Sequence, residues 1–415
     1  MHSRIFIIVL LPLLLVNGET VLADDPQELV EMELGPVAGA RKHVFVPLSV
    51  VPFNLTEFAD EIETKLMGHC VGYQFVVSFN GTPVVKRAGG VARRAPDKSP
   101  RPMTTGDKYN IASISKTMTA IAAMKVLDQK GLHVGDTIGK FLPDSFATEA
   151  ICHDKRISFR TLTFRELLTH KSGITCKKAG KLEALKACVA AGVLKTDKEE
   201  AQKHPIYNAT NFQLFRILIP EIEAFTPPGT LAPSAGTIKP VHDYPKEYMA
   251  YVQKHVFDPA GLPKLFVKPT GAFPALGYHL YQIPCPEEGF GSDFGDQTQA
   301  AGAGGWTMSS EHLAMVLGTF LYTDKILPRA LVEMMKEQNL GLAAHDVTND
   351  LVSHGHGGWY PGFDDTGKQM NTGELGTLAY GLSNGVSVAL FVNSQLGRNW
   401  NTRDIVDAAV KKMVK

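Results

Sequence analysis

The chain has 415 residues, enough for one large domain or two ordinary ones, and 44% of them are hydrophobic, so a sizeable core can form. Its 42 lysines and arginines balance 42 aspartates and glutamates, which makes the formal net charge at pH 7 zero. A chain without excess positive charge lacks the electrostatic attraction that nucleic acid and anionic membranes exert, so the composition argues against both as partners.

The N-terminus has the pattern of a signal peptide. Arg4 precedes an apolar run at residues 5–16 that is too short to span a bilayer comfortably, and a Val-Leu-Ala tripeptide ending at Ala23 provides a cleavage site. An uncleaved membrane anchor is the alternative. We predict a signal peptide at 1–23 and a secreted protein, extracellular or, in a bacterium, periplasmic, with no integral membrane span after cleavage.

The cysteine content fits an oxidising compartment, and an odd number of cysteines leaves at least one without a partner inside the chain. Cys176 and Cys188 are close in sequence and can pair, whereas the spacing leaves the other pairings open. No Cys-x-x-Cys occurs, which argues against a zinc or thioredoxin-like site. In a eukaryote, three Asn-x-Thr sequons would predict a glycoprotein. The cysteines are Cys70, Cys152, Cys176, Cys188 and Cys285, and the sequons begin at Asn54, Asn80 and Asn208.

After an N-terminal extension at 24–50, the chain is expected to form a helix, a β-hairpin and a second helix. Apolar residues at helical spacing mark the helices, and β-branched and aromatic residues mark the strands. The hairpin turns at Asn80-Gly81, a strong two-residue turn signal, and the second helix ends at Gly131, a C-capping residue. The expected ranges are 55–68 for the first helix, 72–79 and 82–91 for the strands, and 110–131 for the second helix.

The middle of the chain, about 132–325, predicts a helical lobe in which apolar-periodic segments alternate with loops that contain proline and glycine. Strand signals return late, in a second hairpin around residues 383–385, and the chain ends in an amphipathic helix. The expected ranges are 160–170, 184–194 and 244–257 for helices of the middle part, 376–382 and 386–394 for the late strands, and 402–415 for the last helix.

Helix and hairpin therefore open the chain, and hairpin and helix close it. A lone hairpin is only marginally stable, so both ends need a partner. The economical solution is one antiparallel sheet built from both chain ends and flanked by helices. The sequence thus predicts an α+β fold in a single domain at 51–415, with the helical lobe inserted between the two parts of the sheet.

The helix at 110–131 begins with a Ser-x-x-Lys arrangement, at Ser113 and Lys116. Residues three apart share one face of a helix, so the lysine amine can reach the serine hydroxyl. Serine is a weak nucleophile that needs a base, and lysine can be that base only if burial or positive charge lowers its pKa. By itself this spacing occurs about once by chance in a chain of this length, and the alternative is a solvated lysine on a core helix.

Four further segments follow in order and favour the catalytic interpretation. Together with IASISK at 111–116 they resemble the serine β-lactamase-related family, which includes class C β-lactamases, D-Ala-D-Ala carboxypeptidases and related esterases. The resemblance covers roughly residues 60–415 and implies the same α+β layout. The segments are SFRTLTFRELLTHKSGI at 158–174, YNATNFQL at 207–214, AGGWTMSSEHLAMV at 303–316 and HGHGGWYPGF at 354–363.

The resemblance implies a role for each matching residue of the first two motifs. Ser113 would be the acylated nucleophile, and Lys116 would help to take its proton. Tyr207 matches the tyrosine of the family's Tyr-x-Asn motif, a second proton carrier on the helical lobe. Cations at Lys116 and His356 would lower the pKa of this tyrosine, which is near 10 when unperturbed.

The third motif of the family matches His356, Gly357 and Gly358. It would lie at the edge of the sheet, where the glycines would let the substrate approach the backbone. The histidine can change charge near neutral pH. The N–H groups of Trp359 and Ser113 would form the oxyanion hole. Because no partnered ligand spacing accompanies the histidines, we expect neither a metal nor a cofactor.

The second motif departs from the family pattern, because it reads Tyr207-Asn208-Ala209. Ala209 holds the place of the asparagine that would hydrogen-bond the substrate amide and the lysine. This departure weakens amide and β-lactam recognition more than acyl transfer itself. Asn208 should point elsewhere, and a glycan on it would obstruct the site, so either that sequon is unused or turnover is lost.

The leading hypothesis is a secreted serine hydrolase that acts through an acyl-enzyme on Ser113. The expected substrates are small esters first, then D-amino-acid amides or peptides, then β-lactams. The alternative is a catalytically weak or inactive binding or assembly protein on the same fold, since a fold does not fix a function. The oligomeric state stays open.

Overall fold

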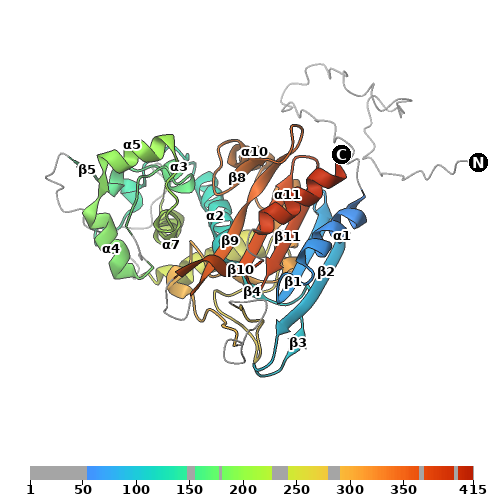
Figure 1. Ribbon diagram of the computed structural model, residues 1–415. Helices are drawn as coiled ribbons and strands as arrows, with labels where there is room; N and C mark the ends of the chain where they lie inside the picture. The colour runs from blue at the N-terminus through green and yellow to red at the C-terminus, as the bar shows by residue number, and fades with distance from the viewer. Residues whose placement is uncertain are drawn as a thin grey trace, which may run out of the picture. The chain divides into compact units, whose positions relative to one another are not determined.

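The computed structural model describes residues 54–146, 155–176, 180–226, 242–278, 290–363, 369–396 and 401–414 (Figure 1). The predicted signal peptide, the extension at 24–50, Cys152 and Cys285 lie outside these residues. No helix in the described ranges has the length and hydropathy needed to cross a membrane.

A seven-stranded antiparallel sheet carries the fold, in the order β3-β2-β1-β11-β10-β9-β8 (Figure 1). Its centre joins the two ends of the domain, because β1 pairs with β11, with Tyr73 opposite Val392 and Phe79 opposite Val386. The expected sheet built from both chain ends is confirmed. The strands are β1 Gly72–Phe79, β2 Thr82–Arg93, β3 Arg101–Pro102, β8 Ala343–Asp346, β9 Val352–Phe363, β10 Gln369–Leu382 and β11 Val386–Val392.

Both expected hairpins turn at the predicted residues. Asn80 and Gly81 have φ angles of 47° and 79°, the left-handed conformation that a type I′ turn needs at both positions. The second hairpin joins β10 to β11 through Gly385, which has a φ of 92°. Strand β8 was not expected, because all its residues are exposed and carry no apolar pattern.

Helices cover both faces of the sheet. On one face, α1 (Leu55–Leu66) and α11 (Thr402–Met413) lie side by side (Figure 1) and share a core with Phe75 of β1. On the other face, α9 (Ser310–Tyr322) packs on β1 and β11 in the core that contains Val76. Since both faces are covered, β1 and β11 are buried along nearly their whole length and do not alternate between apolar and polar residues.

Helix α2 (Ser115–Gln129) is enclosed by protein over most of its length and contacts both α7 and α8. Its apolar and small residues surround the helix, the pattern of a helix that is buried on all sides. It ends as expected at Gly131, whose φ of 64° suits the residue that follows a helix C-cap. Its start differs from the prediction, because a 3₁₀ turn at Ala112–Ile114 precedes the regular helix.

The middle of the chain is helical, as expected, in short pieces. The helix predicted at 160–170 is much shorter in the structure, where α3 covers Phe164–Leu168. Thr163 and Glu166 form a capping box at its start, and His170, just after its end, has a φ of 58°. Helix α9 lies within the range 132–325 that was expected to form the helical lobe, but it packs on the sheet. The helices of this part are α3 Phe164–Leu168, α4 Leu182–Ala191, α5 Lys195–Lys203, α6 Thr210–Gln213, α7 Phe215–Ala224 and α8 Tyr244–Val252, and α10 Arg329–Glu337 follows α9.

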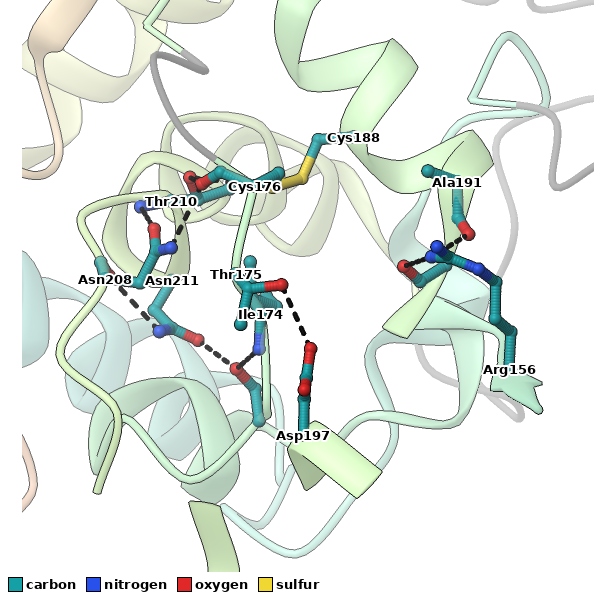
Figure 2. Close-up of a disulfide and its surroundings, with 12 residues drawn as sticks. Arg156, Ile174, Thr175, Cys176, Cys188, Ala191, Asp197, Asn208, Thr210 and Asn211 are labelled. Atoms are coloured by element: carbon teal, nitrogen blue, oxygen red, sulfur yellow. Dashed lines mark hydrogen bonds between the residues drawn. A yellow bond between two sulfur atoms is a disulfide. The ribbon is translucent and has the colours of Figure 1, made fainter. Parts of the chain in front are cut away.

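Two pairs of two-residue strands and a disulfide complete the described structure. The expected pairing of Cys176 with Cys188 is confirmed; it joins the segment after α3 to helix α4, with 5.9 Å between the Cα atoms (Figure 2). Such a cross-link stabilises a domain by about 3 kcal/mol, mainly by restricting the unfolded chain. Cys70 carries a free thiol. The short strands are β4 Tyr109–Asn110 paired with β7 Thr307–Met308, and β5 Arg156–Ile157 paired with β6 Val193–Leu194.

Candidate active site

Ser113 lies in a strained turn directly before α2. Its neighbour Ala112 has a φ of 47°, a left-handed conformation that costs an alanine about 1–3 kcal/mol. Two hydrogen bonds hold the turn: the Ala112 N–H donates to Asn110 Oδ1 at 2.7 Å, and Thr377 Oγ1 of β10 donates to the carbonyl of Ile111 at 3.1 Å. The sheet and the strand before the turn together fix Ser113 at the head of the buried helix.

Two proton-carrying side chains contact the Ser113 hydroxyl. Lys116 Nζ lies 2.9 Å from Ser113 Oγ, and the Tyr207 hydroxyl donates to the same oxygen at 2.7 Å. Lys116 Nζ also donates to the carbonyl of Ala303 at 2.7 Å. Lys116 and Tyr207 are neighbours as well, with 5.0 Å between the amine nitrogen and the centre of the phenol ring. The first two motifs therefore meet at one oxygen atom.

Burial changes the chemistry of Lys116. Its side chain is only 2% exposed, and loss of hydration lowers its pKa to about 7. At neutral pH a substantial fraction of this amine is uncharged and has a lone pair. A base whose pKa lies near the working pH is suited to general base catalysis. Lys116 thus meets the condition that the Ser-x-x-Lys interpretation required.

Tyr207 differs from the expectation. We expected nearby cations to lower the pKa of Tyr207. Loss of hydration instead raises it, and the hydrogen bond with Ser113 offsets this only in part. Lys116 has a pKa of about 7 and is therefore neutral in the alkaline range where the phenol would ionise, so its charge does not lower the pKa of Tyr207. The side chain is 57% exposed, yet its hydroxyl stays protonated at neutral pH. Tyr207 therefore carries a proton that it can donate, and the neutral fraction of Lys116 can accept one.

His356 also differs from the expectation of a charge change near neutral pH. Burial, reinforced by the charge of Lys116, lowers the pKa of His356 to about 4. The ring is therefore neutral at pH 7. Its Nδ1 lies 2.5 Å from the carbonyl of Gly357, and because a carbonyl can only accept, the ring proton is on Nδ1. The ring centre is 6.3 Å from that of Tyr207, so the structure brings this residue into the site as predicted.

The third motif lies where β9 becomes the edge of the sheet. Strand β8 pairs only with Val352–Gly355, so from His356 onward β9 has a strand, β10, on one side only. The region beyond this point packs against the turn that carries Ser113. Trp359 follows on this edge with its side chain 45% exposed. Its N–H as an oxyanion donor, together with that of Ser113, stays a prediction.

The two glycines of the third motif lack a side chain for different physical reasons. A Cβ at Gly358 would lie 2.6 Å from the carbonyl oxygen of Ile111 and would also collide with Thr377 Oγ1. Gly358 thus lets β9 approach the nucleophile turn, which corrects the expectation that it opens space for substrate. A Cβ at Gly357 would meet only Thr377 O, at 3.8 Å, and Gly357 is exposed. Only Gly357 remains suited to substrate approach.

The side chain of Asn208 points away from Ser113, as expected. Its amide donates to the carbonyl of Cys176 at 3.0 Å, and its side-chain oxygen accepts from the N–H of Thr210 at 2.8 Å (Figure 2). Both ends of this amide therefore make hydrogen bonds inside the protein. Ala209 is exposed and offers no polar atom in place of the asparagine.

Sequence reasoning missed three contributors to the site. Asn110 holds the strained turn, and the carbonyl of Ala303 accepts from Lys116. The ring of His170 lies 4.5 Å from that of Tyr207, centre to centre. Ala303 and His170 lie within segments that carry the family resemblance, but only the folded chain shows which of their atoms reach the site.

The fold and the contacts between Ser113, Lys116 and Tyr207 are those of a serine hydrolase. The Beta-lactamase family model matches residues 59–411, and the chain therefore belongs to the beta-lactamase family. The family expected from the ordered motifs is confirmed.

Solved structures show the same fold at low sequence identity. The D-amino acid amidase from Ochrobactrum anthropi SV3 is 18% identical, with a TM-score of 0.61 over 87% of this chain and 98% of that one. FmtA from Staphylococcus aureus is 17% identical, with a TM-score of 0.61 over 88% of this chain and 91% of that one. EstCE1, a hydrolase with promiscuous acyltransferase activity, is 17% identical, with a TM-score of 0.60 over 86% of this chain and 98% of that one.

The pKa of Lys116 predicts the pH dependence of turnover. We expect kcat/KM for p-nitrophenyl acetate to rise as the pH increases through about 7, because only the neutral amine can accept the Ser113 proton. His356 is neutral on both sides of this range and should add no inflection there. In Lys116→Arg the base stays charged, so activity should fall about a hundredfold or more and lose this inflection. A flat wild-type profile between about pH 5 and 9 would contradict the assignment.

Alanine at each glycine of the third motif separates packing from substrate access. Gly358→Ala forces the nucleophile turn to move, so it should lower the free energy of unfolding by about 1–3 kcal/mol and abolish most activity. Gly357→Ala should raise KM, and its free energy of unfolding, measured with urea, should stay within about 0.5 kcal/mol of wild type. Equal loss of stability in both variants would show that the two positions do not differ in this way.

Proposed function

We propose that the protein is a secreted serine hydrolase that forms an acyl-enzyme on Ser113 and acts on small esters in preference to D-amino-acid amides or peptides. The observation that carries the proposal is the shared oxygen of Ser113, with Lys116 Nζ at 2.9 Å and the Tyr207 hydroxyl at 2.7 Å. A lysine with a pKa of about 7 is the base that a serine nucleophile needs.

Acylation begins at the neutral Lys116 amine. The proton of Ser113 passes to Lys116 Nζ as Oγ forms a bond to the substrate carbonyl carbon. The resulting ammonium is stabilised by the carbonyl of Ala303 and by the face of the Tyr207 ring, 5.0 Å away. The carbonyl oxygen of the substrate becomes an oxyanion, for which the N–H groups of Ser113 and Trp359 are the proposed donors.

Collapse of this intermediate needs an acid at the leaving group. Tyr207 is protonated at neutral pH and already donates to Ser113 Oγ, so it is placed to give its proton to the departing alcohol oxygen. Lys116 then returns the proton to Tyr207, and the acyl group remains on Ser113. A water molecule releases the acid by the same proton transfers in reverse, which restores neutral Lys116.

The substrate preference follows from Ala209. An activated ester needs the nucleophile, the base and the oxyanion donors. An amide substrate also needs a hydrogen bond that positions its amide group and a proton on its leaving nitrogen. The alanine side chain at position 209 cannot form that hydrogen bond. Among the similar structures, one is called a D-amino acid amidase and another a hydrolase with promiscuous acyltransferase activity, and both names are consistent with acyl transfer. Ala209 favours esters for this chain.

Secretion is proposed from the sequence of the N-terminus together with one structural feature. The apolar run at 5–16 and the cleavage tripeptide predict export. The Cys176–Cys188 disulfide is of the kind that forms and persists in oxidising compartments.

Covalent labelling tests the nucleophile. A fluorophosphonate probe should label the wild-type protein at Ser113, and Ser113→Ala should lose the label and about a thousandfold or more of its ester turnover. Ser115→Ala is the matched control. Ser115 follows Ser113 by two residues, and its hydroxyl accepts a hydrogen bond from the Trp306 N–H, so the variant without it should keep the label. An unlabelled wild-type protein would favour the inactive binding protein instead.

Restoring the missing amide tests the substrate preference. Ala209 is exposed, so Ala209→Asn has room for the longer side chain. One polar contact to a substrate amide contributes about 1 kcal/mol, so the ratio of cephalosporin to p-nitrophenyl acetate turnover should rise about fivefold. If the ratio does not change, or if the wild type already prefers the cephalosporin, the role given to position 209 is wrong.

A further inference from the structure

His170 lies just after α3 in a conformation that few side chains adopt. Its φ is 58°, in the left-handed region where glycine and asparagine are the usual residues after a helix end. Its N–H donates to the carbonyl of Leu167 at 3.2 Å, which closes the last turn of α3. The backbone turn alone would suit glycine better, so the imidazole has to be explained by what it contacts.

The contacts of His170 surround Tyr207. The N–H of Ile206 donates to the carbonyl of His170 at 3.0 Å, and the N–H of Asn208 donates to His170 Nδ1 at 3.3 Å. The imidazole also packs on the phenol, with ring centres 4.5 Å apart. One residue therefore holds the chain on both sides of Tyr207 and lies against its ring.

The hydrogen bonds determine where the ring proton of His170 sits. A backbone N–H can only donate, so Nδ1 accepts from Asn208 and the proton is on Nε2. Asn211 supports this arrangement: its amide lies 3.2 Å from His170 Nδ1, and its oxygen accepts from Ser172 Oγ at 2.5 Å. The same Asn211 amide also donates to the carbonyl of Asn208 at 3.2 Å (Figure 2).

The imidazole is neutral in this environment. Burial, with smaller contributions from the charges of Lys116 and His356, lowers the pKa of His170 to about 3. Its Nε2 is buried without a hydrogen-bond partner among the described residues, and the ring also packs on Phe212, 5.2 Å away between centres. Fixation of the ring therefore comes from Nδ1 and from packing.

Tyr207 needs this support because its other side-chain contacts, with Ser113, Lys116 and His356, are those of the site itself. Its side chain is 57% exposed, and it lies in the segment without regular structure between α5 and α6. Its hydroxyl must nevertheless stay within 2.7 Å of Ser113 Oγ. An exposed aromatic side chain on such a segment would otherwise sample other rotamers and lose this contact.

We propose that His170 is the positioning residue of Tyr207 and that its Nδ1 and ring hold the phenol where it can protonate the leaving group. Only the kinetic tests of this inference rest on the proposed function, since the contacts around Tyr207 can be measured without turnover. His170 touches neither the substrate nor Ser113 and acts through Tyr207.

The decisive variant is His170→Phe, which keeps an aromatic ring and removes the acceptor at Nδ1. A p-nitrophenolate leaves without a proton, whereas an alkoxide needs one. Both esters form the same acyl-enzyme and share its hydrolysis, so the comparison uses kcat/KM, which reports acylation alone. His170→Phe should therefore lower kcat/KM for an alkyl ester about tenfold or more and change kcat/KM for the p-nitrophenyl ester of the same acid much less. A merely structural role would lower both equally. Thr169→Ala is the matched control, because its hydroxyl only donates to Arg165 O within the same turn.

A double-mutant cycle with Tyr207→Phe tests whether His170 acts through Tyr207. In the Tyr207→Phe background, His170→Phe should cause no further loss with the alkyl ester. Additive losses, or equal losses with both esters, would overturn the proposal.

Hydrogen exchange tests the contacts independently of catalysis. In His170→Phe the amide of Asn208 should exchange faster than in wild type, while the amide of Ile206, which bonds the backbone carbonyl, should change little. Unchanged exchange at Asn208 would overturn the proposal even if the wild type had no hydrolase activity. Absence of fluorophosphonate labelling in wild type would instead overturn the proposed function and leave the exchange result to decide the inference.

Discussion

Lys116 has an amine on a side chain that is only 2% exposed, in a helix that the sheet layer and the helical lobe enclose together. An ammonium at such a place loses most of its hydration, and its pKa falls to about 7. The neutral amine can then accept a proton from the Ser113 hydroxyl 2.9 Å away. The pKa of Tyr207 is raised by loss of hydration, and Lys116 does not offset this because it is already neutral where the phenol would ionise. The division of roles between base and acid thus follows from how completely α2 is buried.

The other groups of the site reach this amine from distant parts of the chain. Tyr207 comes from the segment before α6, the carbonyl of Ala303 from the segment before β7, and His356 from the edge of β9. The sheet brings β9 to the nucleophile turn only because Gly358 has no side chain there. Pairing of the two chain ends is therefore a condition for the site as well as for the fold.

The sequence predicted those features that depend on local patterns. The Asn80-Gly81 turn, the apolar strands β1 and β11, and the Ser-x-x-Lys spacing each have a local physical reason, and the ordered motifs located Tyr207 and His356. Burial and long-range contacts were not accessible in this way. The protonation of Tyr207 and His356 depends on packing by other elements, β8 has no apolar pattern, and the contacts of His170 involve both backbone and ring atoms whose direction only the folded chain determines.

The disulfide between Cys176 and Cys188 has a mechanical consequence for the site. The carbonyl of Cys176 accepts hydrogen bonds from Asn208 at 3.0 Å and from Thr210 Oγ1 at 3.4 Å, on either side of Ala209. Helix α4 is thereby coupled to the segment of Tyr207 through one covalent bond and two hydrogen bonds, whereas Ser113 and Lys116 are anchored in the core. The position of α4 therefore bears on the segment that carries Tyr207 through these bonds, and no such bond joins α4 to Ser113 or Lys116 among the described contacts.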